Sequence, residues 1–194
     1  MSPNGIFRRA IPAAAVACIV AVPVCFSVNC VVEGPSESSS KTTTGGSQPF
    51  IASEADLAGF RTWQNVPGES ANPPASVHTT GPRTVYVRPF PTHGEKAFPV
   101  GTIIVKEVET GDIPTRKVFA MVKRGGGFNA EGAKDWEFFE LTNVDDMHVQ
   151  ILWRGVSPPL GEGYLAGNGG CNGCHAASPA NDFVQTIGLQ LSSF

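Results

Sequence analysis

The chain has 194 residues, a formal net charge of −3 and only 16% charged side chains. A chain of this length can bury a sizeable core, and we expect one folded domain. The charge provides no basic field to hold nucleic acid, and no run of acidic residues forms a solvating tail. Nucleic acid and other partners recognised mainly through charge are therefore not expected.

The first 32 residues have the composition of an export leader, because Arg8 and Arg9 precede an almost wholly apolar run from Ala10 to Val32. Three fates of this leader are open: cleavage as a signal peptide, lipid attachment at Cys30, or retention as a membrane anchor. Each of them places the rest of the chain outside the cytoplasm, in the periplasm or on the outer surface. Contact with a membrane is expected through this segment alone.

A linker and a mainly β domain follow the leader. Residues 33–49 are rich in Ser, Thr and Gly and predict a flexible linker. The domain, residues 50–194, opens with a predicted helix over Ser53–Val66, in which Ser53 and Asp56 have the spacing of a helix cap. Segments rich in Val, Ile, Phe and Thr and bounded by Gly, Pro, Asn or Asp predict strands over Arg83–Phe90, Gly101–Glu109, Arg116–Arg124, Asp135–Thr142 and Met147–Arg154.

These elements predict a mainly β (α+β) fold. About five strands form a strongly curved antiparallel sheet, with the helix before it and a C-terminal segment after it. The residues from Gly167 to Leu191 are glycine-rich and then alternately apolar, which favours a loop followed by one or two short helical turns.

The stretch "GNGGCNGCHAASPANDF" near the end of the chain contains Cys171, Cys174 and His175 in the order C-x-x-C-H. Two thiols at this spacing add to the two vinyl groups of a haem, and the histidine that follows binds the iron. We therefore expect one covalent haem c with His175 as iron ligand. Export favours this interpretation, since thioethers form outside the cytoplasm.

Two other uses of the motif are weaker. A zinc ion needs further ligands, whereas the remaining histidines, His78, His93 and His148, stand alone in the sequence. A redox disulfide between the cysteines would be typical of a thioredoxin-like strand before the motif, and no such strand is predicted here.

The sixth ligand of the iron determines what a haem protein does. A strong second ligand makes an electron carrier, while an open face makes a gas binder or a catalyst. Met121 and Met147 lie on predicted strands, and His93 lies in the "PFPTHGEKAFP" loop. These three side chains are the candidates for a sixth ligand.

Several stretches together resemble one family. "FRTW", "FPVGTIIVKE", "FAMVKR", a W-x-F-F strand and a terminal "CNGCH…DFV" follow one another across about Phe50 to Phe194. In this order they resemble the cytochrome P-460 family, whose relatives include the beta-type cytochromes c-prime. The resemblance implies an antiparallel β domain that holds one c-type haem in a pocket between sheet and helix, and it implies a homodimer.

The resemblance also implies roles for particular residues. In the namesake enzymes a lysine is joined to the porphyrin edge and hydroxylamine is oxidised, and Lys106 stands at the matching position. If Lys106 stays free, the protein is nearer to the nitric-oxide-binding relatives, whose open iron face is crowded by apolar caps. The candidates for such caps are Phe60, Phe90 and Phe98.

Strand alternation puts Lys106 on one face with Thr102, Ile104 and Val108, but it does not decide which face meets the haem. Hydroxylamine oxidation also needs a proton acceptor. The carboxylate downstream of the motif is Asp182, a candidate for that catalytic role that also suits the fixing of a local turn. Catalytic members have a glutamate where this chain has Ala180 or a nearby small residue, which counts against hydroxylamine turnover.

We expect an exported c-type haem protein with an open distal iron site, which binds or oxidises hydroxylamine or nitric oxide and passes electrons to a redox partner protein. Such an activity would make it a haem oxidoreductase. The alternatives are a six-coordinate electron-transfer cytochrome and a non-catalytic haem module of a surface assembly.

Overall fold

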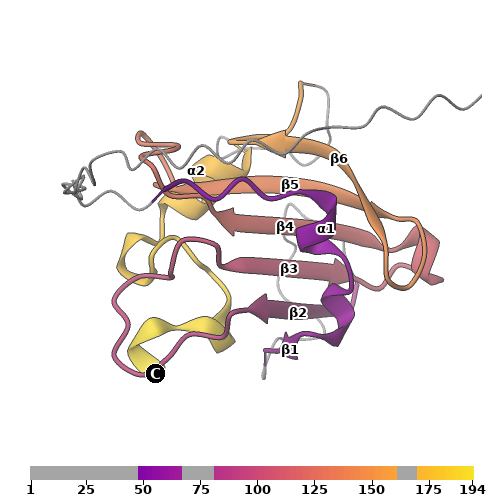
Figure 1. The fold of residues 1–194 in the computed structure, drawn as a ribbon, viewed down its shortest axis with the longest axis horizontal. Coiled ribbons are helices and arrows are strands. Elements are labelled where there is room, and N and C mark those ends of the chain that lie inside the picture. Colours follow the sequence, from indigo (N-terminus) through magenta and orange to yellow (C-terminus); the bar gives the residue numbers. More distant parts are fainter. Residues whose placement is uncertain (1–47, 67–80, 161–169) are drawn as a thin grey trace, which may run out of the picture. The chain divides into compact units, whose positions relative to one another are not determined.

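The computed structural model describes residues 48–66, 81–160 and 170–194, and the predicted leader and nearly all of the linker lie outside these ranges. Figure 1 shows one open antiparallel sheet whose strands lie side by side in chain order. They are β1 (Gln64–Asn65), β2 (Arg83–Arg88), β3 (Ile103–Val108), β4 (Lys117–Lys123), β5 (Trp136–Asn143) and β6 (Val149–Gly155). The predicted mainly β, antiparallel fold is confirmed, with six strands in place of about five.

The predicted helix over Ser53–Val66 is wrong in its length. The helix α1 spans only Glu54–Leu57, and a single 3₁₀ turn, η1 (Phe60–Thr62), follows it. The predicted cap is present, because the Asp56 carboxylate accepts the Ser53 N–H at 2.8 Å. The helix ends at Ala58, whose backbone is extended, and the next residue, Gly59, takes a left-handed φ of 65° and donates its N–H to the Met147 carbonyl at 2.7 Å.

The C-terminal residues form α2 (Gly170–Ala176), which carries the C-x-x-C-H motif, and the 3₁₀ turns η4 (Pro179–Asn181), η5 (Ile187–Leu189) and η6 (Leu191–Ser193). These are more helical turns than the one or two that the sequence predicts. Within the described ranges, no helix has both the length and the apolar character needed to cross a bilayer.

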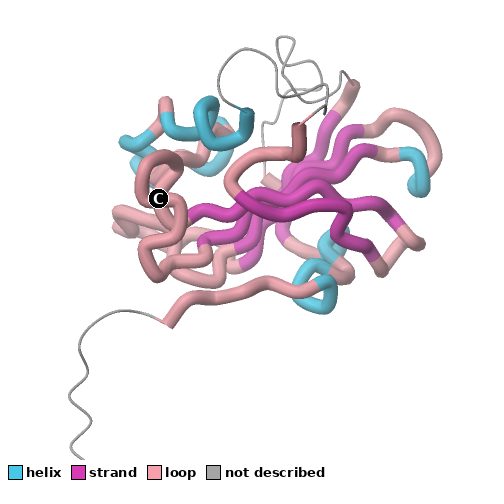
Figure 2. Tube along the Cα trace, turned by 90° about the horizontal axis from the view of Figure 1, so that it is seen from above, coloured by secondary structure: helices cyan, strands magenta, loops and turns pink. Residues whose placement is uncertain are grey.

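The sheet separates two hydrophobic cores. On the face that we call the α1 face, Leu57 and Phe60 pack with strand residues such as Val105. On the opposite face, the α2 face, Cys171, Val184, Leu189 and Leu191 pack with Val85, Val87, Ile104, Met121 and Phe138. Figure 2 shows the twisted sheet with helical segments on both sides.

The register of the central strands assigns side chains to these faces. Lys106 of β3 lies opposite Val85 on one side and Phe119 on the other, and Phe119 lies opposite Glu140. The next row on the same face is Val87, Ile104, Met121 and Phe138. Lys106 therefore lies on the α2 face, the face that also carries the motif. Alternation within one strand could not decide this, because it does not say which face is which.

A buried carboxylate holds the α1 face together. Glu107 is 1% exposed and accepts hydrogen bonds from Arg61 and, at 3.2 Å, from Arg116. Arg61 also donates to the Asn143 side chain at 2.7 Å, and Asn143 donates to the Ile113 carbonyl at 2.7 Å. The network thereby joins η1, β3, β5 and the 3₁₀ turn η2 (Ile113–Thr115).

Replacing Glu107 by Ala should lower the free energy of unfolding by roughly 3 kcal/mol, because two guanidinium groups lose the carboxylate that balances their charge. The expected loss is at the low end for a buried ion pair, since Arg61 and Arg116 remain partly exposed. Urea denaturation measures it. Glu109→Ala, at an exposed position just beyond β3, is the matched control, with a change of about 0.5 kcal/mol or less. Equal losses in the two variants would contradict the structural role of Glu107.

Candidate functional site

The helix α2 is attached to the loop between β4 and β5 through a residue inside the motif. The side-chain oxygen of Asn172 accepts the Asn129 amide at 2.7 Å and the Ala133 N–H at 2.8 Å. Gly132 lies so close to Asn172 that a β-carbon at position 132 would overlap its side chain. The spacer of the C-x-x-C-H motif therefore contributes to the placement of α2 on the sheet.

The two motif cysteines are free thiols in different surroundings. Cys171 is buried and faces the sheet, and burial raises the pKa of its thiol to about 11, against a smaller lowering by the positive charge of Lys106. Cys174 is partly exposed, and its backbone carbonyl accepts a hydrogen bond from Gln185. The redox disulfide is not formed in this structure.

His175 has one ring nitrogen engaged. Its Nδ1 lies 2.8 Å from the Phe183 carbonyl oxygen, and a carbonyl can only accept, so Nδ1 carries the proton. Burial lowers the pKa of His175 to about 4, the hydrogen bond to Phe183 opposes this, and the positive charge of Lys106 lowers it further. At neutral pH the imidazole is uncharged, and the lone pair of Nε2 is available to a metal ion.

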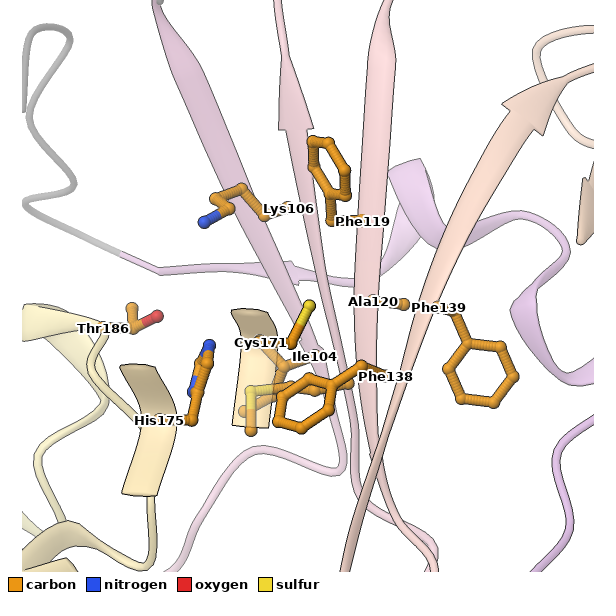
Figure 3. A pocket seen from close by; sticks show the side chains of 10 residues that line it. Ile104, Lys106, Phe119, Ala120, Phe138, Phe139, Cys171, His175 and Thr186 are labelled. Atoms are coloured by element: carbon orange, nitrogen blue, oxygen red, sulfur yellow. The ribbon is translucent and has the colours of Figure 1, made fainter. Parts of the chain in front are cut away.

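A pocket of about 450 Å³, including its mouth, lies between α2 and the sheet. Figure 3 shows His175 and Cys171 of α2 together with side chains of β3, β4 and β5. The lining residues are Ile104, Lys106, Phe119, Ala120, Met121, Phe138, Phe139, Cys171, His175 and Thr186.

The structure brings together four residues that the sequence singled out. Cys171, His175, Lys106 and Met121 all line this pocket. Lys106 is partly buried and is close enough to influence the pKa of both Cys171 and His175. Its surroundings are therefore those of the predicted site, although the link to a porphyrin stays a prediction.

The three phenylalanines predicted as caps lie elsewhere. Phe60 is in the core of the α1 face, where its ring contacts Tyr86 with centroids 5.2 Å apart, and the sheet separates it from His175. Phe90 packs on Phe194, with ring centroids 5.2 Å apart. Phe98 packs on Trp136, with centroids 5.7 Å apart. None of the three is among the described residues that line the pocket.

The sequence interpretation missed Phe119 and Phe138, which do line the pocket. The ring of Phe138 lies 4.9 Å from that of His175, centroid to centroid. Both belong to strands that the sequence predicts, and pairing those strands in register with Lys106 would have identified them. Phe139 is also among the lining residues, but its ring points away from His175 in Figure 3.

The remaining predicted residues lie outside the pocket lining. His93 and Met147 are exposed, and Met147 lies beside Gly59 of the η1 turn. Asp182 is buried, and its carboxylate accepts hydrogen bonds from Lys123 and from the Phe98 N–H. The lysine and the backbone amide thus occupy the carboxylate that the sequence offered as a proton acceptor. His78 lies outside the described residues.

The donor set fits a covalently attached haem. Such a group needs two thiols and one imidazole nitrogen from the chain, and Cys171, Cys174 and His175 provide these beside a largely apolar pocket. In the described parts of the chain, no three His, Cys, Asp or Glu side chains converge as a protein-only metal site requires. Comparison of the chain with protein-family models, curated proteins and solved structures gives no match. The resemblance to the cytochrome P-460 family therefore stays a prediction.

The two spacer residues of the motif should respond to alanine in opposite directions. Asn172→Ala leaves the Ala133 N–H and the Asn129 amide without their acceptor and should cost about 1–3 kcal/mol of unfolding free energy. Gly173→Ala, at an exposed position within the same helix, should leave the stability unchanged or raise it by up to about 1 kcal/mol. Urea denaturation of the haem-free protein measures both. An Asn172→Ala variant with unchanged stability would show that the hydrogen bonds of Asn172 to the β4–β5 loop do not hold α2 in place.

Proposed function

We propose that the protein is an exported c-type haem protein with an open distal iron site, which binds or oxidises a small nitrogen species such as hydroxylamine or nitric oxide. Cys171 and Cys174 hold the haem through thioethers, and His175 binds the iron. The observation that supports this most is the combination at α2: two free thiols at the attachment spacing and a neutral imidazole whose Nδ1 is engaged. A bound haem would supply an iron atom that takes small ligands and carries electrons one at a time.

The chain's own residues would shape the environment of that iron. Ile104, Phe119 and Phe138 line the pocket with apolar side chains, and an apolar wall favours small uncharged ligands over ions. Lys106 adds one positive charge on the sheet side. In this proposal, a Lys106 side chain joined to the porphyrin goes with hydroxylamine oxidation, and a Lys106 side chain that is not joined goes with nitric oxide binding.

The proposal includes a redox partner protein that accepts or delivers electrons, and a homodimer follows from the family resemblance. The second candidate function is electron transfer by a six-coordinate haem. One observation favours it: of the three candidate sixth ligands, Met121 lines the pocket. Its side chain is 7% exposed and lies in a cross-strand row with Ile104 and Phe138, which is also how a core methionine packs.

The exported protein should have the mass of its polypeptide plus one haem, and the haem should remain on the Cys171–Cys174 peptide after denaturation and digestion. Mass spectrometry measures both. The reduced optical spectrum then separates the functions. A high-spin spectrum supports an open site, a red-shifted Soret band supports the Lys106 link, and a sharp low-spin spectrum supports electron transfer. A mass without haem would remove the proposal.

His175→Ala should leave the haem attached through its thioethers and change the spectrum of the iron, because the axial nitrogen is lost. His148→Ala is the matched control, since His148 is exposed and pairs with Asp145 at 2.8 Å. Optical and electron paramagnetic resonance spectra compare the two. An unchanged iron spectrum in His175→Ala would show that another residue is the ligand.

Met121→Leu tests the alternative function. The two side chains have similar volume, so stability should fall by less than about 1.5 kcal/mol. An open-site protein keeps its high-spin spectrum in this variant, as it should in the control Met147→Leu, whose side chain is exposed. Conversion from low spin to high spin in Met121→Leu alone would establish the electron-transfer function instead.

A further inference from the structure

The residues that hold the hydrogen-bond acceptor of His175 have an unusual backbone. Asp182 and Phe183 are consecutive residues with positive φ angles, 48° and 66°. Side-chain-bearing residues adopt this left-handed conformation only at an energetic cost, and it persists where surrounding contacts hold it. Phe183 supplies the carbonyl oxygen that lies 2.8 Å from His175 Nδ1. The contacts that hold Asp182 therefore bear on the orientation of His175.

Asp182 has three anchors on the rest of the domain. Its Oδ1 accepts a hydrogen bond from the Lys123 ammonium at 2.6 Å, and its Oδ2 accepts the Phe98 N–H at 2.9 Å. Its backbone carbonyl accepts the indole N–H of Trp136 at 2.7 Å. All four residues are buried, with Asp182 at 9% and Lys123 at 6% exposure.

The anchors and the histidine are joined by a short path. Lys123 ends β4 and Trp136 begins β5, so two neighbouring strands hold Asp182 from one side. The next residue, Phe183, donates its N–H to the Ser178 carbonyl at 2.8 Å and presents its own carbonyl to His175. A shift of Asp182 would rotate this peptide unit away from the imidazole.

We propose that Asp182 is a positioning residue: its anchors hold the left-handed pair, which aims the Phe183 carbonyl at His175 Nδ1 and leaves Nε2 as the metal-binding nitrogen. A hydrogen bond from Nδ1–H makes an imidazole a stronger donor through Nε2. The effect on the iron rests on the proposed function, whereas the effect on the histidine tautomer does not. This role differs from the proton acceptor that the sequence offered, since both carboxylate oxygens are already taken.

The first experiment uses the full chain produced without haem. The ¹⁵N chemical shifts of the imidazole report which ring nitrogen carries the proton. The parent chain should show the Nδ1–H tautomer at His175. Asp182→Asn places an amide N–H₂ or a neutral oxygen against the Lys123 ammonium, which weakens the anchor, and should give a mixture with the Nε2–H tautomer.

The second experiment uses the haem-loaded protein. In Asp182→Asn the iron–histidine stretching frequency should fall, because the imidazole becomes a weaker nitrogen donor. The midpoint potential should rise, because a weaker donor stabilises the oxidised iron less. Trp136→Phe removes one anchor and keeps an aromatic ring, and it should shift both quantities in the same direction by less. It also decides the question if Asp182→Asn does not fold.

Glu107→Ala is the matched control, because it removes a buried carboxylate from the α1 face, away from His175. It should lose stability without changing the tautomer, the frequency or the potential. If Asp182→Asn and Trp136→Phe lose stability yet keep all three at the parent values, Asp182 is merely structural and the inference is overturned. If the chain carries no haem, the proposed function fails, and the tautomer measurement alone decides the role of Asp182.

Discussion

The strand register of the sheet is the constraint on which the candidate site depends. Successive side chains of a strand point to opposite faces, so a shift by one residue would move every pocket side chain to the wrong side. The observed pairing puts Lys106 opposite Phe119, and Ile104 opposite Met121, on the face that α2 covers. The neighbouring positions Val105 and Glu107 are buried on the other face, where Val105 belongs to a separate hydrophobic core. One register thus provides both a packed support and a pocket.

The late position of the C-x-x-C-H motif has a structural meaning in this arrangement. The strands are complete in the chain before α2 begins, and α2 then covers a face that would otherwise leave Ile104, Met121 and Phe138 in water. Polar contacts set where it lies: Asn172 contacts the β4–β5 loop, and Asp182 contacts the ends of the same two strands. Apolar burial attaches the segment, while these directional bonds decide the orientation of the thiols and the imidazole.

Much of the fold could be predicted from the sequence because it follows from local patterns. The five predicted strands lie within about two residues of observed ones, since runs of Val, Ile and Phe bounded by turn residues carry that signal. The helix over Ser53–Val66 failed because the backbone becomes extended at Ala58 and left-handed at Gly59, and the final residues of the predicted helix pair with β2 instead. The helical spacing of the apolar residues gave no sign that Gln64 and Asn65 would pair with β2. This pairing forms β1, the strand that the sequence did not predict.

Some residues of the candidate site could likewise be identified from local sequence, whereas others depend on contacts between distant parts of the chain. The motif residues Cys171, Cys174 and His175 are adjacent in sequence and could be identified there. Of the cap candidates, Phe60 packs on the α1 face, whereas Phe90 and Phe98 pack on the α2 face but outside the pocket lining. They could not be distinguished from core residues, because their contacts join segments that are far apart in the chain. The same holds for Asp182, whose partners Lys123 and Phe98 are 59 and 84 residues away along the chain.

Two lysines lie at the candidate site: Lys123 pairs with Asp182 outside the pocket lining, and Lys106 belongs to the lining. Asp182 of the C-terminal segment and Lys123 of β4 neutralise each other, so this pair can hold the backbone without placing a net charge beside the imidazole. Lys106 is the cation among the described lining residues, in a wall that is otherwise apolar or neutral. A positive charge in largely apolar surroundings acts more strongly on a group that gains negative charge there than it would in water. Under the proposed function, it is therefore Lys106, more than the attachment motif, that would distinguish hydroxylamine oxidation from nitric oxide binding.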